Sequence, residues 1–382
     1  MSPFHRQAGT CEIITTAARL AEVAAILSQQ AEIAVDLEMD SLHHYREKVC
    51  LVQVSTREQS WLIDPLALTS LAPLAAPLGN PDIVVVMHGA DYDIRSLHRD
   101  YGIEVNNLFD TMLAARFLGI GEFGLAALLR ARFGIELDKK YQKADWSKRP
   151  LSREMCAYAV ADTSDLLPLY DQFRAELADK RRLEWLIEEG IIVCQARVTE
   201  KDGPLFLYCK GAGKLRGHTL AILEELLQLR DRQSELLDRP PFKVLSADTL
   251  IEVAETRPRT LGELSLVKGM SSGQLQRHGA AILAAVERGI ATPENSLPRF
   301  PRSAKKEVLE KVKERLKSLK TWRERFSCEL GLDPGVLAPN WLLEAVADTQ
   351  GATREELDLL PGIREWQKHL FGEELARVLS TV

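Results

Sequence analysis

Acidic residues gathered in three short blocks are the feature that most constrains this chain. They come in three blocks, IAVDLE with Asp36 and Glu38, HGADYD with Asp93, and YAVAD with Asp162. Side chains two residues apart in a strand project to the same side, so Asp36 and Glu38 face one way. Like charges at this spacing repel each other unless a cation lies between them. The blocks therefore predict a site where carboxylates converge.

The second and third blocks add acids from helices. Asp93 is expected near the start of a helix, where the helix dipole favours a carboxylate, although Asp91 and Asp93 taken alone resemble ordinary N-terminal helix acids. His88, at the end of the preceding strand, is more typical of a satisfied core histidine. Tyr158 and Asp162 are four residues apart and share one helix face. A tyrosine one turn from an acid can hold a water molecule, and its alternative is an ordinary core tyrosine.

The ligand types indicate which ions such a site holds. Oxygen donors without His or Cys favour hard cations, Mg²⁺ or Mn²⁺. Two such ions can activate a water and stabilise the leaving 3′-oxygen of a phosphodiester. Asp40 continues the alternation of the first block and is a weaker ligand candidate.

The chain changes character after about residue 203. The first part mixes strand and helix patterns, including one long predicted helix over 152–177, and this predicts an α/β layer fold with a mixed sheet. Residues 212–291 and 301–382 read as helices, and they resemble each other at an offset of roughly 92–93 residues, the scale of a duplicated domain. We predict domains at 1–203, 212–291 and 301–382, with the proline-rich ATPENSLPRFPR as a linker.

Each helical copy carries a glycine before its last helix. Gly269 and Gly362 follow a similar L-x-x-[VL]-x-G step. The glycine either lets backbone N–H groups approach a phosphate or makes a tight turn between helices. The sequence leaves both interpretations open.

Composition bounds the class of protein. Hydrophobic residues make up 46% and charged residues 27% of the chain, which is typical of a soluble globular protein. No apolar run approaches the roughly 18 residues of a membrane span, and a cytoplasmic location is expected. The six cysteines form no CxxC pair and are expected to be free thiols. A net charge of −6 argues weakly against a nucleic-acid partner, although local basic stretches can still contact phosphates.

A basic stretch just before the third block interleaves cations with aromatic residues. KKYQKADWSKRPLSR has the mixture that single-strand binders use for stacking and backbone contacts. The stretch over 305–325 is also basic, but a solvated helix face is its usual explanation. We predict substrate contacts from this first stretch and from residues that flank the acids of the first block: Lys140, Lys143, Trp146, Arg149, Leu37, Met39 and His43.

The three acidic blocks and their context resemble a known family. The blocks DLE, HGADYD and YAVAD look like the three motifs of the DEDD 3′-to-5′ exonucleases of the tyrosine subtype, and their order and context resemble ribonuclease D. VCLVQVS, LFDTMLAARFLG and the segment from LDKKYQKADW to YAVAD add to the likeness. Residues 212–291 are similar to the HRDC domain, and 301–382 look like a diverged second copy. The resemblance implies a ribonuclease H-like exonuclease domain with a mixed central sheet, followed by two all-α HRDC-type domains.

The resemblance also implies roles for residues. Asp36, Glu38, Asp93 and Asp162 would hold two divalent cations, and Tyr158 would orient the attacking water. The expected reaction releases nucleoside 5′-monophosphates from RNA with a free 3′ end, with transfer RNA precursors as expected substrates. Neither a membrane nor an obligate protein partner is implied.

Two points stay open at the level of sequence. Many relatives carry Asn or Ser shortly before the acid of the second block, whereas this chain has Ala90, Asp91 and Tyr92. We favour Asp93 over Asp91 because its position matches the family's motif. The competing functions are a DNA 3′-to-5′ exonuclease and a nucleic-acid binding scaffold with an idle catalytic fold.

Overall fold

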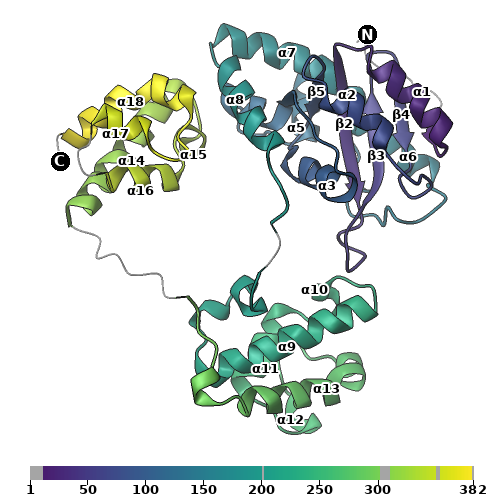
Figure 1. Cartoon of the computed structure of the whole chain (residues 1–382), viewed down its shortest axis with the longest axis vertical. Helices are drawn as coiled ribbons and strands as arrows, with labels where there is room; N and C mark the ends of the chain where they lie inside the picture. The colour runs from purple at the N-terminus through teal and green to yellow at the C-terminus, as the bar shows by residue number, and fades with distance from the viewer. Residues whose placement is uncertain (1–11, 200–201, 302–309, 350–352, 381–382) are drawn as a thin grey trace. The chain divides into compact units, whose positions relative to one another are not determined.

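The computed structural model describes residues 12–199, 202–301, 310–349 and 353–380. Contacts divide the chain into two compact units (Figure 1). One unit comprises Met1–Met39, Val49–Val198 and Lys306–Val382, and the other comprises Asp40–Lys48 and Thr199–Lys305. The domain boundaries predicted from the sequence stay predictions, and residues 1–11 and 302–309 lie outside the described residues.

A six-stranded mixed sheet forms the centre of the α/β domain. Its strands are β1 (Glu12–Ile14), β2 (Glu32–Met39), β3 (Val49–Ser55), β4 (Ser60–Ile63), β5 (Val84–Met87) and β6 (Leu108–Asp110). The order is β1-β4-β3-β2-β5-β6, with β2 and β4 antiparallel to β3 and the remaining pairs parallel. This arrangement confirms the predicted mixed sheet. It places the first acidic block on a central strand, paired on both sides.

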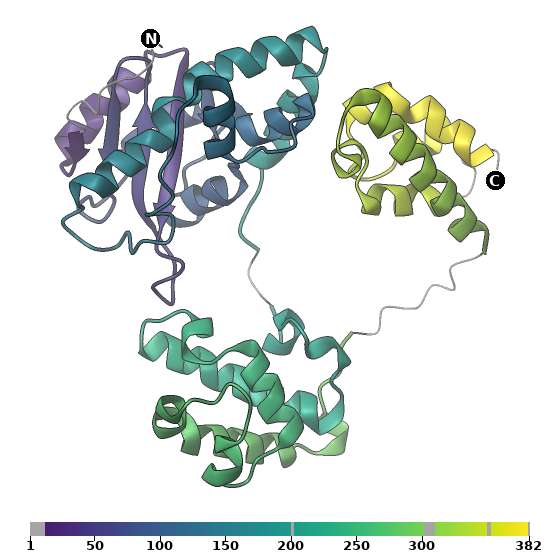
Figure 2. The same ribbon diagram turned by 180° about the vertical axis from the view of Figure 1, so that it is seen from behind.

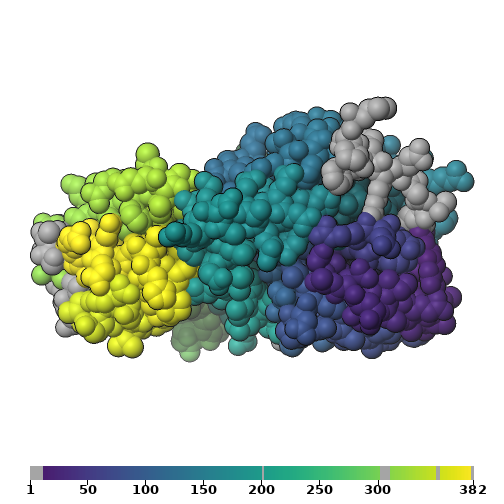
Figure 3. All heavy atoms as spheres, turned by 90° about the horizontal axis from the view of Figure 1, so that it is seen from above, coloured from purple at the N-terminus to yellow at the C-terminus, as the bar shows by residue number. Residues whose placement is uncertain are grey.

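Helices cover both faces of this sheet. They are α1 (Ala17–Leu27), η1 (Ala72–Leu74), α2 (Ala75–Gly79), α3 (Asp91–Tyr101), α4 (Thr111–Leu118), α5 (Leu125–Phe133), α6 (Arg153–Ser164), α7 (Leu166–Asp179) and α8 (Leu183–Cys194). Val35 and Leu37 of β2 pack into a core with residues of α1 and α3, and the purple residues of α1 lie at the surface (Figure 3). On the other face α6 packs across β2, β3 and β4, and the teal helices cross the purple strands in the reverse view (Figure 2). The alternate residues of β2, which include the acids, therefore face α6.

One predicted helix is divided in two. The sequence pattern predicts a single helix over 152–177, but α6 ends at Ser164 and α7 begins at Leu166. Pro168 explains the break, because its ring would clash with the carbonyl group of Ser164 in a continuous helix and it has no N–H to donate. The break ends α6 two residues after Asp162.

The remaining helices form two sets, and no strand follows β6 among the described residues. The first set is η2 (Leu205–Tyr208), η3 (Ala212–Lys214), α9 (Gly217–Leu236), α10 (Pro241–Val244), α11 (Ala247–Thr256), α12 (Leu261–Ser265), α13 (Ser272–Ile290) and η4 (Glu294–Ser296). The second set is α14 (Glu310–Leu330), α15 (Pro334–Leu337), α16 (Asn340–Ala347), α17 (Arg354–Asp358) and α18 (Glu365–Ser380). Both glycines of the repeated step have positive φ, 86° at Gly269 and 84° at Gly362. A Cβ there would meet Thr249 or Trp341, so the structure favours a tight turn between helices.

The second helical set packs on α8 within its unit. The rings of Trp185 and Trp366 stack with centroids 4.6 Å apart. The carboxylate of Glu188 accepts hydrogen bonds from the backbone N–H groups of Glu365 (2.7 Å) and Trp366 (3.0 Å), at the N-terminus of α18. Apolar stacking and capping of a helix end together fix this contact.

The structure also bears on the cysteines and on membrane-spanning helices. Cys50, Cys156, Cys194, Cys209 and Cys328 are free, whereas Cys11 lies outside the described residues. Within the described part of the chain, no helix combines the length and apolar character that crossing a bilayer requires.

Candidate active site

Three of the four predicted acidic ligands lie together between the sheet and α6. Asp36 and Glu38 come from β2 and Asp162 from α6, and one carboxylate oxygen from each lies within 4.8 Å of the others. Burial, followed by the charges of Asp93, Asp162 and Glu38, raises the pKa of Asp36 well above its usual value. Burial and the neighbouring aspartates also raise the pKa of Glu38 to about 9. The fold keeps these carboxyl groups close together despite their mutual repulsion.

Asp93 is the fourth acid of the site. Its side chain is 8% exposed, and burial followed by the charge of Asp110 raises its pKa to about 8. Asp91 instead forms an ion pair with Arg95 on the surface of α3, and its side chain is 57% exposed. The structure thus separates the two candidates of the second block, with Asp93 facing the other acids and Asp91 facing solvent.

Asp110 fixes the segment that carries Asp93. It caps α4 through the N–H groups of Met112 and Leu113, and it also accepts hydrogen bonds from Gly89 and Ala90 at 2.9 Å each. These bonds tie the turn between β5 and α3 to the end of β6. Sequence reasoning missed this role, although an aspartate just before a helix is the signature of an N-cap.

Tyr158 lies one helical turn from Asp162 and hydrogen-bonds its carboxylate. Burial raises the pKa of Asp162 to about 7, and this hydrogen bond partly opposes the shift. Burial and the surrounding carboxylates raise the pKa of the Tyr158 hydroxyl well above its usual value. The phenol therefore stays protonated at neutral pH and can donate or accept a hydrogen bond.

Asp40, the weaker ligand candidate, lies just beyond the end of β2 and is not among the clustered acids of the site. The register of the β2–β3 pair shifts between Glu38 and Met39, where Cys50 of β3 is the extra residue, and β2 ends at Met39. Asp40 is fully buried and accepts hydrogen bonds from the backbone N–H (2.8 Å) and the ammonium group (2.5 Å) of Lys48. Its function is to brace the turn between β2 and β3.

The acids open into a cleft of about 400 Å³. Its other walls come from the start of α5, from the loop that follows α5 and from the end of β5. The lining residues are Asp36, Leu37, Glu38, His88, Gly124, Leu125, Ala126, Ala127, Leu137, Asp138, Lys139, Gln142, Tyr158 and Asp162. The predicted contact residue Leu37 is among them, whereas Met39, His43, Lys140 and Lys143 are not.

His88 lines this cleft, contrary to its interpretation as a core residue. The hydroxyl group of Thr111 donates to the carbonyl oxygen of Met87 (3.0 Å), so its oxygen accepts the bond from His88 Nδ1 (2.9 Å). Burial lowers the pKa of His88, which keeps the ring neutral. The proton therefore lies on Nδ1, and Nε2 is a hydrogen-bond acceptor.

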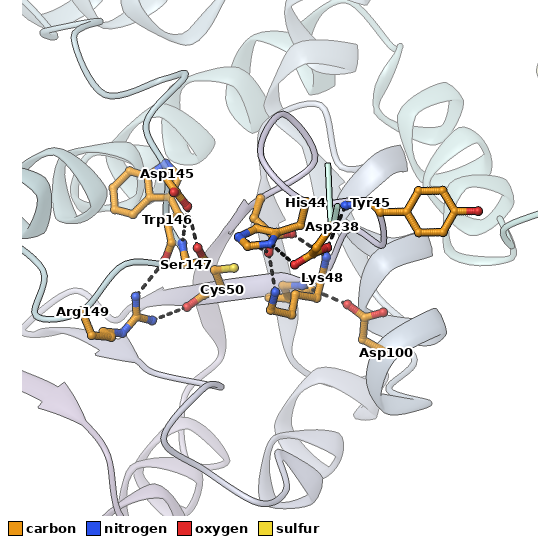
Figure 4. A network of polar contacts seen from close by, with 12 residues as sticks. His44, Tyr45, Lys48, Cys50, Asp100, Asp145, Trp146, Ser147, Arg149 and Asp238 are labelled. Carbon is orange, nitrogen blue, oxygen red and sulfur yellow. Dashed lines mark hydrogen bonds and ion pairs between the residues drawn. The ribbon is translucent and has the colours of Figure 1, made fainter. Parts of the chain in front are cut away.

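Two residues predicted to contact substrate have structural roles instead. Trp146 is 1% exposed and cannot stack on a base, but its ring packs against Tyr158 with centroids 5.9 Å apart. Arg149 pairs with both oxygens of Asp64 at 2.6 and 2.7 Å. It also donates a hydrogen bond to the carbonyl oxygen of Cys50 (Figure 4). The contacts of Arg149 fasten the loop before α6 to β3 and to the end of β4. The ring of Trp146 supports the ring of Tyr158.

The donor set suits divalent cations. The carboxylates of Asp36, Glu38 and Asp162 supply hard oxygen ligands, and Asp93 lies close enough to raise the pKa of Asp36. Without cations their mutual repulsion and burial favour the protonated forms, whereas a bound cation favours the ionised forms. Metal binding is therefore the state in which these side chains are electrostatically compatible.

Comparisons with known proteins agree with this geometry. A family model described as a 3′–5′ exonuclease matches residues 11–178, and the HRDC domain model matches residues 219–286 and 312–379. The chain is 29% identical to ribonuclease D of Pseudomonas paraeruginosa, over 92% of this chain and 93% of that protein. It is 36% identical to the exosome complex exonuclease RRP6 of Saccharomyces cerevisiae, over 72% of this chain and 40% of that protein.

Solved structures give the same assignment. The crystal structure of Escherichia coli RNase D matches with a TM-score of 0.73 and 27% identity, over 98% of this chain and 99% of that one. The catalytic core of RRP6 from Trypanosoma brucei matches with a TM-score of 0.66 and 30% identity, over 75% and 81%. Fold and site together define a 3′–5′ exonuclease with HRDC domains. The chain belongs to the ribonuclease D family, as the resemblance in its sequence predicted.

The raised pKa values predict how stability depends on pH. The folded, metal-free protein binds more protons than the unfolded chain between about pH 4 and pH 9, because the pKa of Asp162 is about 7, that of Asp93 about 8 and that of Glu38 about 9. Its stability therefore falls as pH rises through this range. We expect the melting temperature in EDTA to fall from pH 5.5 to 9, and the stabilisation by Mn²⁺ to grow over the same range. Asp36→Asn should flatten both profiles; a Mn²⁺ effect independent of pH would contradict the assignment.

The contrast between Asp91 and Asp93 predicts unequal effects of the same substitution. Asp93→Asn removes a charged oxygen ligand and should lower hydrolysis of a 3′-labelled oligonucleotide at least about 100-fold, since loss of an outer partner alone costs about 10–100-fold. Asp91→Asn breaks only an exposed ion pair and is its matched control, with a rate near that of the wild type. Equal losses in both variants would show that the second-block ligand is wrongly assigned.

Proposed function

We propose that this chain is a metal-dependent 3′–5′ exoribonuclease that uses two Mg²⁺ or Mn²⁺ ions and releases nucleoside 5′-monophosphates one at a time. Structured RNAs with a free 3′ end, including transfer RNA precursors, are its proposed substrates. The single observation that carries the proposal is the convergence of Asp36, Glu38 and Asp162 in one cleft with Asp93 beside them. Membership of the ribonuclease D family supports it.

The reaction is hydrolysis of the last phosphodiester. A water attacks the phosphorus, the bond from phosphorus to the 3′-oxygen of the penultimate nucleotide breaks, and that oxygen takes up a proton. When bound, divalent cations supply Lewis-acid polarisation of the phosphate and offset the charge that develops on the leaving oxygen. The four carboxylates would hold the cations, and their rigid placement on β2, α3 and α6 would avoid reorganisation during the reaction.

Tyr158 has the geometry of a residue that orients water. Its hydroxyl group hydrogen-bonds Asp162 and lines the cleft, while Trp146 and Tyr141 pack against its ring with centroids 5.9 and 6.0 Å away. Because the phenol stays protonated, Tyr158 does not act as a general base. It holds the attacking water in line with the scissile bond through its oxygen lone pairs.

The choice of RNA over DNA rests on the relatives. Proteins named ribonuclease D match almost the whole chain, and the Escherichia coli structure is described as an exoribonuclease involved in structured RNA processing. A 2′-hydroxyl group is what a protein uses to distinguish the two polymers at a given position. Nε2 of His88 is an acceptor in the cleft that such a hydroxyl group can use.

The function is tested with the full chain on 3′-labelled RNA and on DNA of matched sequence, each with Mg²⁺ or with EDTA. We expect labelled nucleoside 5′-monophosphate from RNA with Mg²⁺, slower release from DNA, and none with EDTA. Asp36→Asn should abolish turnover and leave RNA binding within a few-fold, which separates loss of chemistry from loss of affinity.

Other outcomes have distinct meanings. Faster release from DNA would assign the chain as a DNA exonuclease. Retained binding without cleavage by the wild type under any divalent cation would favour a binding scaffold. Internal cleavage products or nucleoside 3′-monophosphates would exclude the proposed direction of attack.

The role assigned to Tyr158 predicts a selective kinetic defect. Tyr158→Phe keeps the ring packing on Trp146 but removes the hydroxyl group, so kcat should fall about 100-fold, within the range typical for a positioned proton-transfer or water-orienting group. KM should change much less, because the ring does not hold the RNA. Tyr141→Phe is the matched control, since Tyr141 packs on the same cluster but does not line the cleft. An unchanged kcat for Tyr158→Phe would remove Tyr158 from the reaction.

A further inference from the structure

Gln53 is a buried polar residue directly beside the carboxylate cluster. It lies in the middle of β3, has no solvent exposure, and pairs with Asp36 of β2 in the antiparallel ladder. Among the residues that the structure describes, neither Nε2 nor Oε1 of Gln53 has a hydrogen-bond partner. An unpaired buried amide destabilises the folded state, so its presence in a central strand requires an explanation.

The sheet directs this side chain toward the acids. Residues directly opposite each other in an antiparallel pair project from the same face, with Cβ atoms roughly 4.5–5.5 Å apart. On β3, Leu51 and Ser55 share this face: Leu51 packs in one cluster with Ala159 of α6, and Ser55 Oγ lies 2.7 Å from Thr163 Oγ1. Gln53 lies between these two contacts. Its amide is therefore enclosed beneath the stretch of α6 that carries Asp162.

The neighbouring carboxylate is poorly supported in the metal-free protein. One carboxylate oxygen of Asp36 lies within 4.8 Å of oxygens of Glu38 and Asp162, so this carboxylate faces like charges. A neutral amide donor beside a carboxylate stabilises its negative charge. Gln53 is the residue opposite Asp36 that carries such a donor.

We propose that Gln53 positions Asp36 for cation binding. In the cation-bound site the Nε2 group of Gln53 would donate a hydrogen bond to the carboxylate of Asp36, and Oε1 would accept one from a water molecule. The amide thus contributes little to the metal-free fold and stabilises the loaded site, because outer partners fix the orientation and charge of metal ligands. This inference rests on the proposed metal-dependent function.

The test compares Gln53→Met with the wild type in two states of the full chain. Methionine has nearly the same length and volume but lacks the amide, so the EDTA-treated variant should melt at the same temperature as the wild type or higher. Titration with Mn²⁺, followed by calorimetry, should show a Kd about tenfold higher than that of the wild type. Both readouts are independent of catalysis.

Ser55→Ala is the matched control on the same strand and face. Its hydroxyl group has partners in Thr163 and Ser60, so its loss should lower the melting temperature in EDTA and leave the Kd for Mn²⁺ unchanged. The two substitutions therefore have opposite signatures.

Each alternative result overturns the inference in a recognisable way. An unchanged Kd for Mn²⁺ in Gln53→Met would show that the amide does not support the ligands. A lower melting temperature in EDTA, as in Ser55→Ala, would show that the amide is already paired in the metal-free protein. Failure of the wild type itself to bind Mn²⁺ would instead overturn the proposed function, and the inference with it.

Discussion

Mutual repulsion of buried carboxylates is the interaction on which the rest of this structure depends. Asp36, Glu38 and Asp162 place oxygens within 4.8 Å of one another in a largely buried site, an arrangement that no chain adopts for stability alone. The apolar contacts of β2 on its other face and the packing of α6 across three strands hold these side chains in place. The unfavourable repulsion between these carboxylates is confined to the cleft, where bound cations would offset it.

Local features of the backbone around the site fix the positions of the carboxylates. The end of β2 at Met39 limits its acidic face to two residues, and Asp40 beyond it braces the turn that follows. Asp110 ties the start of α3 to the end of β6, which fixes the position of Asp93. Both features lie at the end of a strand, where the sheet is rigid but the chain can still change direction. Precise ligand placement follows from rigid elements rather than from flexible loops.

The sequence predicts the acids and the mixed sheet because both depend on short-range periodicity. Asp36 and Glu38 alternate with apolar residues, and Tyr158 and Asp162 are one helical turn apart, so pattern alone gives their shared faces. Trp146 and Arg149 were wrongly assigned because a run of cations and aromatics has the same composition whether it binds RNA or packs a loop. Single polar residues inside apolar strands, such as Gln53, give no periodic signal. The division of the long helix at Pro168 was visible in the sequence and was missed.

The charge of the cleft determines how substrate enters it. Its lining contains four acids and one lysine, Lys139, so in the ionised state without cations it repels a phosphodiester. Two residues that the sequence predicts as base or phosphate contacts instead interact within the protein: Trp146 is buried, and Arg149 pairs with Asp64. Attraction for the scissile phosphate must then come mainly from the cations that the carboxylates hold. Cation binding would thus govern the placement of the scissile phosphate as well as its hydrolysis, and the acids that repel this phosphate in the absence of cations are the groups that would hold them.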